Sequence, residues 1–476
     1  MTRVDRRTFL QLLGAGAATL SACGTPEGGP PLFDARATPP SGAWPDADPE
    51  DATAFPEGVA AGDVTADAAI LWTHYAGDAE LTLVLAAWDG SAWATTDHRA
   101  TPVEGYVHVD LATLKADTHY AYQFRTADGA ASAVGRFNTA PPADHTGPVT
   151  FAATACLHQS REDYPSVTHA VNRGPLDLFL FLGDTAYFDG LPNIEAFRNL
   201  YAHNLRKPAF QAAMGHTSCV YTWDDHEFDN NFDPETIDPD YFQMCADAWF
   251  EHLPVRRSAT HPNRIWRSMR YGRTAEFFIL DCRAERRPSQ DLYISPEQLD
   301  WLIDGLRRSE STWKVISNSV PIAGLQNEAW NVPFALRDRW QGYEAQRAEL
   351  IRRITEAGIP GVIFVSGDVH CAFIARVDHE GPGRRLFDLV AGPAGSFRNP
   401  LARFLVDGDQ IPWGNGDWNT MRVELTASGH ATAAFINDDD DTVAWLHFDD
   451  EGRILDLFGY DEVEDTTGPI PFVQDP

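Results

Sequence analysis

Between residues 55 and about 140, apolar and polar side chains alternate in short bursts. The bursts lie at residues 69–72, 81–85, 107–111 and 120–124, and turns rich in Gly and Asp separate them. Because successive side chains of a strand point to opposite faces, this pattern indicates antiparallel strands that bury one face. We predict an all-β sandwich domain of fibronectin or immunoglobulin type over residues 55–142, ending at a Pro-Pro pair.

From residue 149 the rhythm changes to continuous apolar runs of strand length followed by helical spacing. Ser295-Pro296-Glu297-Gln298 has the form of a capping box that starts a helix, and a second helix is expected over residues 341–357. After about residue 386 alternating stretches return, at 421–425 and 432–436. Strands that alternate with helices predict an α/β sandwich with two central sheets over residues 148–450, followed by a C-terminal tail over 451–476.

The amino terminus carries Arg6-Arg7 before an apolar run that ends at Leu20-Ser21-Ala22-Cys23. A twin arginine ahead of a short apolar run is a signal for the export of folded proteins. We therefore expect residues 1–23 to be a twin-arginine signal of lipoprotein type, with the protein in the periplasm or at the cell surface and anchored through an acylated Cys23. Cleavage near Ala22 with release of the protein is the alternative. Residues 24–54, rich in Gly, Pro, Ala and Asp, are predicted to be a disordered linker.

The chain of 476 residues carries a formal net charge of −32 at pH 7. This charge disfavours nucleic acid as a partner, and an anionic substrate would need bound cations to reverse the local field. No internal run is apolar enough to span a bilayer, so we expect contact with the membrane only through the N-terminal lipid anchor. We also expect a monomer. A chain folded before export folds in a reducing environment, so buried thiols rather than disulfides are expected at four cysteines without assigned chemistry, Cys219, Cys245, Cys282 and Cys371.

Four short polar clusters each follow an apolar run of strand length. They read T-A-C after residues 149–153, G-D-T-A-Y after 178–182, W-D-D-H-E after 219–221 and G-D-V-H after 362–365. Parallel α/β sheets place their chemistry just beyond the carboxyl ends of their strands. We therefore expect one shared metal centre, built from Cys156, Asp184, Tyr187, Asp225, His226, Asp368 and His370.

Each of these side chains has a chemical interpretation and a simpler structural one. Asp184 can bridge two metals, and a phenolate at Tyr187 favours ferric iron, although this Tyr could also only pack in the core. His226 can donate a proton to a leaving oxygen, or it can only orient its neighbours. Asn318 follows an apolar run and offers a neutral oxygen ligand, while Cys156 offers either a thiolate ligand or a buried thiol.

In this order the clusters resemble the alkaline phosphatase D (PhoD-like) family of metallophosphoesterases, relatives of the purple acid phosphatases. The resemblance covers residues 55 to 450 and extends to Leu280-Asp281-Cys282-Arg283, Trp340-Gln341-Gly342-Tyr343 and Val390-Ala391-Gly392-Pro393. It implies a calcineurin-like metallophosphoesterase fold behind a PhoD-type N-terminal domain. Phe188 and Asn318 depart from the family pattern, where an acidic residue and Gln are usual, which puts the number of calcium ions in question.

The resemblance implies one ferric ion (Fe3+) and one or two calcium ions (Ca2+). Cys156, Asp184, Tyr187 and His370 would hold the ferric ion. The second cation would be held by oxygen atoms alone, which suit Ca2+, from Asp184, Asp225, Asn318 and Asp368. The resemblance also gives Arg283 the role of a clamp on a phosphate oxygen.

We therefore predict an exported metal-dependent hydrolase of phosphate monoesters or diesters, acting on a small-molecule or polymeric substrate. The cations would lower the pKa of a bound water, whose hydroxide attacks phosphorus in line. A phosphodiesterase with phospholipase D-like or cell-wall-polymer specificity is the alternative. A non-catalytic protein that binds an envelope polymer is a third possibility.

Overall fold

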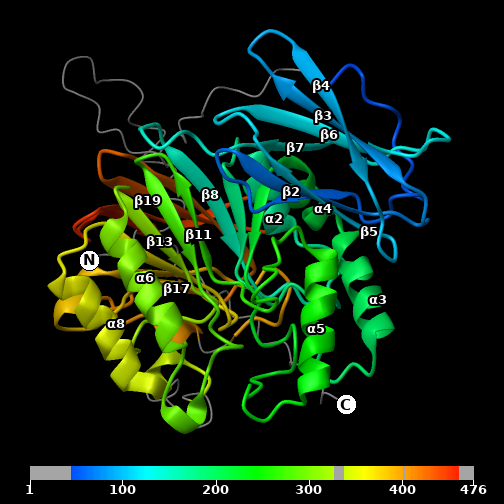
Figure 1. Cartoon of the computed structure of the whole chain (residues 1–476). Helices are drawn as coiled ribbons and strands as arrows, with labels where there is room; N and C mark the ends of the chain where they lie inside the picture. Colours follow the sequence, from blue (N-terminus) through cyan, green and yellow to red (C-terminus); the bar gives the residue numbers. More distant parts are fainter. Residues whose placement is uncertain (1–43, 326–336, 400–401, 460–476) are drawn as a thin grey trace, which may run out of the picture. The chain divides into compact units, whose positions relative to one another are not determined.

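The computed structural model describes residues 44–325, 337–399 and 402–459. The predicted export signal and most of the predicted tail lie outside these residues. The described chain forms three β-sheets, of ten, seven and four strands, with helices on the outer sides of the two larger sheets (Figure 1). Within the described ranges, no helix combines the length and the apolar character that crossing a bilayer requires.

The ten-stranded sheet combines a parallel centre with antiparallel flanks. Its order across the sheet is β21 (Ile454–Gly459), β20 (Thr442–Asp449), β19 (His430–Asn437), β18 (Asn419–Leu425), β8 (Val149–Thr154), β9 (Leu178–Phe181), β10 (Ser218–Tyr221), β1 (Val59–Gly62), β2 (Ala68–His74) and β5 (Tyr106–Ala112). Strands β8, β9, β10 and β1 are parallel neighbours. The carboxyl ends of β8, β9 and β10 therefore lie at one edge of the sheet.

The seven-stranded sheet packs against the ten-stranded one. Its order is β11 (Arg267–Tyr271), β12 (Ala275–Ile279), β13 (Trp313–Ser317), β14 (Val362–Ser366), β16 (Phe387–Val390), β15 (Ala372–Arg376) and β17 (Trp413–Asn415), with β12, β13, β14 and β16 parallel. A buried apolar core joins the two sheets, with Phe151 and Val220 from one and Phe277, Val315 and Leu389 from the other. The prediction of two central sheets is confirmed.

Helices cover the outer face of each large sheet. On the ten-stranded sheet these are α2 (Pro165–Asn172), α3 (Ile194–Leu205), α4 (Pro208–His216) and α5 (Pro239–His252). On the seven-stranded sheet they are α6 (Pro296–Arg308) and α8 (Glu344–Glu356). Short 3-10 turns lie at Pro288–Gln290, Trp340–Tyr343, Pro382–Arg385 and Ala402–Phe404.

The two predicted helices form, each with a local difference. Ser295 caps α6 by accepting a hydrogen bond at Oγ from the backbone N–H of Gln298 at 3.1 Å. The Gln298 side chain does not return to Ser295 as in a full capping box, because it is buried and bonded to the backbone of Asp281. The predicted helix over 341–357 begins as a 3-10 turn and becomes α-helical only at Glu344.

The N-terminal domain is all-β, as predicted, but it shares a sheet with the rest of the chain. A four-stranded sheet of β4 (Trp93–Ala100), β3 (Leu81–Trp88), β6 (His119–Arg125) and β7 (Gly135–Asn138) packs on β1, β2 and β5. Those three strands are also the edge of the ten-stranded sheet, since β1 pairs with β10. The domain is therefore not closed on itself, and its immunoglobulin-like or fibronectin-like character stays a prediction.

Two other expectations concern the linker and the thiols. The predicted linker is too long at its carboxyl end, because Trp44 is 2% exposed and packs on Val84, Ala86 and Ala121. Asp51 also donates its backbone N–H to the carbonyl of Ala131 at 2.7 Å.

The buried thiols are confirmed, since the five described cysteines are all free and buried, namely Cys156, Cys219, Cys245, Cys282 and Cys371.

Candidate metal centre

The predicted ligands converge where strands of both large sheets end. Cys156 follows β8, Asp184 follows β9, Asp225 follows β10, and Asp368 and His370 follow β14. Their ligand atoms form three overlapping groups in which all atoms lie within 4.8 Å of one another: Cys156, Asp184 and His370; Asp184, Asp225 and His226; Asp224, Asp225 and Asp368. Asp184 and Asp225 each belong to two groups, so the three form one continuous centre.

Backbone geometry at these positions is unusual for residues with a side chain. Cys156, Asp184, Asp368 and His370 all have positive φ, between 56° and 67°. Such conformations cost energy and persist only where the surrounding structure enforces them, and they are frequent at functional sites. Each of these residues turns the chain sharply directly after a buried strand, which brings its side chain over the sheet edge. Gly183 permits one of these turns, since a Cβ there would lie 2.4 Å from the Cβ of Asp224.

One half of the centre combines four kinds of donor, and we call it the mixed-donor half. It consists of Cys156, Asp184, Tyr187 and His370. The Tyr187 hydroxyl lies 3.1 Å from Oδ2 of Asp184 and 3.2 Å from Nε2 of His370. Thiolate, phenolate, imidazole and carboxylate together are a donor set that fits ferric iron. These four side chains are the ones to which the family resemblance assigns that ion.

Burial sets the protonation state of the mixed-donor half. It raises the pKa of the Cys156 thiol and of the Tyr187 hydroxyl, and the charge of Asp184 raises both pKa values further. Burial, followed by the charge of His226, lowers the pKa of His370 to about 3, so this imidazole is neutral. A neutral imidazole is ready to bind a metal, whereas the thiol and the phenol need a cation nearby before they lose their protons.

The other half is acidic, and we call it the carboxylate half. It consists of Asp224, Asp225 and Asp368, and oxygen donors of this kind fit calcium. Burial disfavours ionisation of Asp225, but the charges of Arg283 and His226 hold its pKa below the usual range. Burial raises the pKa of Asp368 to about 6 despite the charge of Arg283.

Arg283 lies inside this half rather than at its surface. Its side chain is 0% exposed and contacts Asp224 at 2.5 Å, Asp368 at 2.8 Å and Asp225 at 3.5 Å, and it also pairs with Asp338. The guanidinium therefore presents no exposed atom to a phosphate oxygen. The predicted clamp role would require these ion pairs to break.

Asn318 follows a strand, as the other candidate ligands do, but its side-chain oxygen already accepts hydrogen bonds from other side chains. It follows β13 and is fully buried. Its amide oxygen accepts hydrogen bonds from Nε1 of Trp340 at 3.1 Å and from Sγ of Cys282 at 2.8 Å. These contacts fix the side chain, and its place among the ligands of the second cation stays a prediction.

His226 lies beside the mixed-donor half with its ring on that of Tyr187, the ring centroids 4.0 Å apart. Its Nδ1 lies 2.8 Å from both carboxylate oxygens of Asp189. Burial disfavours the charged imidazole. The charges of Asp225 and Asp184, together with the Asp189 hydrogen bond, outweigh burial and raise the pKa of His226 well above its usual value. A protonated imidazole at this position can serve as a general acid.

Three acidic residues of the centre were missed as site residues, namely Asp189, Asp224 and Glu227. Glu227 is fully buried and accepts hydrogen bonds from the backbone N–H groups of Asp184 at 2.9 Å and Thr185 at 2.6 Å. It also accepts from the N–H of Asp224 at 2.8 Å, and so fixes two ligand-bearing turns together. The string W-D-D-H-E contained two of the three, but a lone acidic residue such as Asp189 carries no signal of this kind in the sequence.

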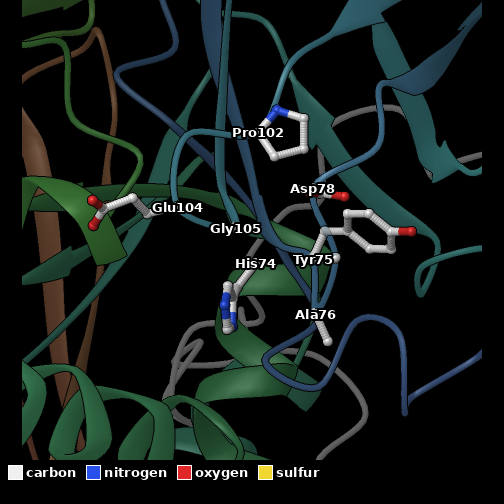
Figure 2. A pocket seen from close by; sticks show the side chains of 8 residues that line it. His74, Tyr75, Ala76, Asp78, Pro102, Glu104 and Gly105 are labelled. Carbon is white, nitrogen blue, oxygen red and sulfur yellow. The ribbon is translucent and has the colours of Figure 1, made fainter.

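A separate hollow lies in the N-terminal domain (Figure 2). Its volume is about 470 Å³, and it is lined by His74, Tyr75, Ala76, Gly77, Asp78, Pro102, Glu104 and Gly105. His74 contacts Glu57 at 2.5 Å, and Glu104 pairs with Arg198 of α3. None of the candidate ligands lines this hollow, and two of its ionisable side chains, His74 and Glu104, are paired.

The amino-acid sequence of this chain is similar to those of known proteins. Residues 151–400 match the family model of PhoD-like phosphatases, and residues 41–141 match that of the N-terminal domain of PhoD-like phosphatases. The chain is 28% identical to alkaline phosphatase D of Bacillus subtilis (strain 168), over 80% of this chain and 74% of that protein.

Solved structures show the same fold. A structure of PhoD superposes with a TM-score of 0.75 at 22% identity, covering 86% of this chain and 94% of that one. The purple acid phosphatase PPD1 of yellow lupin seeds superposes with a TM-score of 0.59 at 15% identity, over 84% of this chain and 73% of that one.

Proposed function

Since the chain belongs to the PhoD-like phosphatase family and is a hydrolase of phosphate esters, we propose that its mixed-donor half holds a ferric ion and its carboxylate half holds calcium. The convergence of four separate strand-end motifs into overlapping ligand groups carries this proposal. Membership of an enzyme family leaves the non-catalytic envelope-binding alternative without support.

The ligands we propose for iron are Cys156, Asp184, Tyr187 and His370. For the second cation we propose Asp184, Asp225, Asn318 and Asp368. When bound, such cations neutralise charge on the phosphoryl group and acidify a water molecule. The protein positions them through backbone turns at positive φ and through the carboxylate of Glu227, which holds the turns of Asp184 and Asp224.

His226 is the proposed general acid. Its proton passes to the ester oxygen as the bond from phosphorus to that oxygen breaks, so the alcohol leaves as a neutral molecule. Asp189 accepts a hydrogen bond from Nδ1 of His226 at 2.8 Å, which leaves Nε2 to carry the transferred proton. Arg283, held among Asp224, Asp225 and Asp368, is proposed to supply a fixed positive charge that keeps these carboxylates together.

Metal analysis of a matched pair of cysteine variants tests the iron proposal. Cys156→Ala is expected to lose iron and nearly all turnover while it stays folded. Cys245→Ala also removes a buried free thiol, but from helix α5, and is expected to keep both iron and turnover. Iron retained at the wild-type level in Cys156→Ala would refute the proposal.

Substrate preference separates the two remaining functional readings. We propose hydrolysis of phosphate monoesters, diesters or both, with phospholipase D-like or cell-wall-polymer phosphodiesterase specificity as the alternative. The comparison is of kcat/KM for a phosphate monoester, its diester counterpart and a polymeric diester, with iron and Ca2+ present. A preference of more than about 100-fold for the polymer, which corresponds to about 2.7 kcal/mol, would favour the alternative.

Export and anchoring are further proposals, supported by Arg6-Arg7 and Cys23 in the sequence. Replacement of both arginines by Lys is expected to keep the protein inside the cell. Cys23→Ser is expected to move it from the membrane fraction to the soluble fraction, because the site of acylation is gone. Membrane association unchanged in Cys23→Ser would exclude the anchor.

A further inference from the structure

The loop of residues 395–399, which we call the Phe397 loop, is fixed to two of the proposed iron ligands. The backbone N–H groups of Gly395 and Ser396 both donate to the carbonyl of Cys156, at 2.9 and 2.8 Å. The N–H of Asn399 donates to the carbonyl of His370 at 3.0 Å, and Ser396 Oγ lies 3.2 Å from Nε2 of His370. The loop is therefore anchored at both ends to the metal centre.

A second anchor holds the loop from its other side. Nε1 of Trp418 donates to the carbonyl of Ser396 at 2.7 Å. The indole is itself restrained, since the guanidinium of Arg161 lies 3.7 Å from its ring centroid and that of Arg398 lies 5.0 Å from it. Cation–π contacts of this kind favour a single orientation of the ring. Ser396 is thus held by Cys156, His370 and Trp418 together.

Phe397 projects from this fixed loop into solvent. Its side chain is 68% exposed. This large apolar ring therefore forgoes most of the stabilisation that burial would give it. Its ring meets that of His370 edge to face, with the centroids 4.2 Å apart and an interplanar angle of 86°. The result is a rigid aromatic surface, open to solvent, in direct contact with a proposed iron ligand.

A continuous run of rings joins this surface to the proposed general acid. His226 stacks on Tyr187, the Tyr187 hydroxyl lies 3.2 Å from Nε2 of His370, and His370 contacts Phe397. These contacts connect Phe397 to His226 through two proposed iron ligands, Tyr187 and His370.

We propose that Phe397 is a specificity-determining residue, whose ring packs against a flat aromatic group carried by the leaving alcohol. Such a group, an aryl ring or the base of a nucleoside, matches a rigid exposed ring and loses little conformational freedom on binding. The proposal rests on the proposed function, because it takes His226 to be on the side of the leaving group. It gives Phe397 no part in metal binding or proton transfer.

The test compares substrates that differ in the leaving group. Phe397→Ala is measured with p-nitrophenyl phosphate, a 5′-nucleotide and glycerol phosphate, each as kcat/KM relative to wild type. A roughly tenfold loss is expected for the first two, chiefly as a higher KM, since one aromatic contact has this magnitude. Glycerol phosphate is expected to change by less than about twofold, because it has no ring to pack. Loss for only one of the two aromatic substrates identifies the aryl or the nucleoside source.

Controls separate specificity from a structural effect. Phe397→Tyr keeps the ring and is expected to retain wild-type kcat/KM for the aromatic substrates. Val103→Ala removes another exposed apolar side chain, 72% exposed and in the N-terminal domain, and is expected to change nothing. Iron content and thermal stability are expected to be unchanged in Phe397→Ala.

Several outcomes would overturn the proposal. An equal loss for all three substrates together with lost iron would give Phe397 a structural role behind His370. No loss for any of the three substrates, or a loss confined to glycerol phosphate, would exclude an aromatic leaving group. Wild-type enzyme without metal-dependent hydrolysis would instead refute the proposed function, so the two failures are distinguishable.

Discussion

The two halves of the metal centre are stabilised in opposite ways. In the mixed-donor half, Cys156, Tyr187 and His370 are uncharged at neutral pH without a cation, since burial raises the pKa of the first two and lowers that of the third. In the carboxylate half, three aspartates lie within 4.8 Å of one another, and the buried guanidinium of Arg283 contacts all of them.

Because of this difference, the two halves of the centre are expected to depend on bound metal in different ways. These neutral side chains can stay close together without a cation, but Cys156 and Tyr187 must release protons when they bind one. Clustered carboxylates repel one another when ionised, so they need either a positive charge nearby or a bound proton. The chain provides that charge itself through Arg283, so the carboxylate half is expected to depend on Arg283 for stability and the mixed-donor half to depend on metal for its chemistry.

Asp184 belongs to both proposed ligand sets, and its replacement is expected to have the largest effect. Asp184→Asn removes the charge that is proposed to serve both cations, so both iron and calcium should fall and turnover should drop by more than about 1000-fold. Metal content by elemental analysis and kcat provide the measurement. Loss of one metal alone would show that Asp184 serves only one half.

Arg283→Met is expected to destabilise the protein without removing iron. It leaves Asp224, Asp225 and Asp368 without their counter-charge, which costs about 3–5 kcal/mol in the free energy of unfolding. Excess Ca2+ should recover part of the loss, because a cation replaces the guanidinium. Denaturant unfolding in the presence of chelator measures the loss of stability, and the same experiment with Ca2+ measures the recovery.

A matched surface variant controls for the loss of any arginine. Arg352→Met removes exposed pairs with Glu349 and Glu356 on helix α8 and is expected to cost less than about 0.5 kcal/mol. If Arg283→Met raised KM and left stability unchanged, the phosphate-clamp role would be favoured instead.

Glu227→Gln is expected to loosen the turns that join the halves. Burial raises the pKa of Glu227 to about 7, although hydrogen bonds from the backbone N–H groups of Asp224, Thr185 and Asp184 favour its ionised form. An amide retains only one acceptor oxygen, so the variant should lose about 2 kcal/mol of stability and roughly 10- to 100-fold in kcat. Exposed Glu356→Gln is the control, and an equal effect in both would contradict the role of Glu227.

Asp189→Asn is expected to have the smallest effect, visible in the pH profile. Asp189 raises the pKa of His226, so its replacement lowers that pKa. The general acid must be protonated, and the alkaline limb of kcat should therefore move to lower pH, while the acidic limb stays in place. An unchanged alkaline limb would mean that His226 is not the group that titrates there.

The sequence was sufficient to locate the candidate ligands because each follows a strand. Continuous apolar runs identify buried parallel strands, and the carboxyl ends of such strands share an edge, so Cys156, Asp184, Asp225 and His370 could be brought together without coordinates. The two-sheet core followed from the same runs. These predictions depend only on local pattern and a general rule of α/β folds.

What the sequence could not show depends on packing between distant segments. Arg283 was expected to clamp a phosphate oxygen, but in the structure its buried guanidinium pairs with four aspartates from three other segments. The pairing of β1 with β10 joins residues more than a hundred positions apart, and alternation in β1 alone does not reveal it. The role proposed for Phe397 likewise depends on its contact with His370, which the sequence does not reveal.

Anomalous diffraction at the iron absorption edge tests the central claim most directly. In crystals of the enzyme purified with its metals, we expect one iron peak within bonding distance of Cys156 Sγ, Tyr187 Oη and a ring nitrogen of His370, with no iron among Asp224, Asp225 and Asp368. A peak bound only by the carboxylates, or full occupancy by another metal with Cys156 and Tyr187 unbound, would contradict the account.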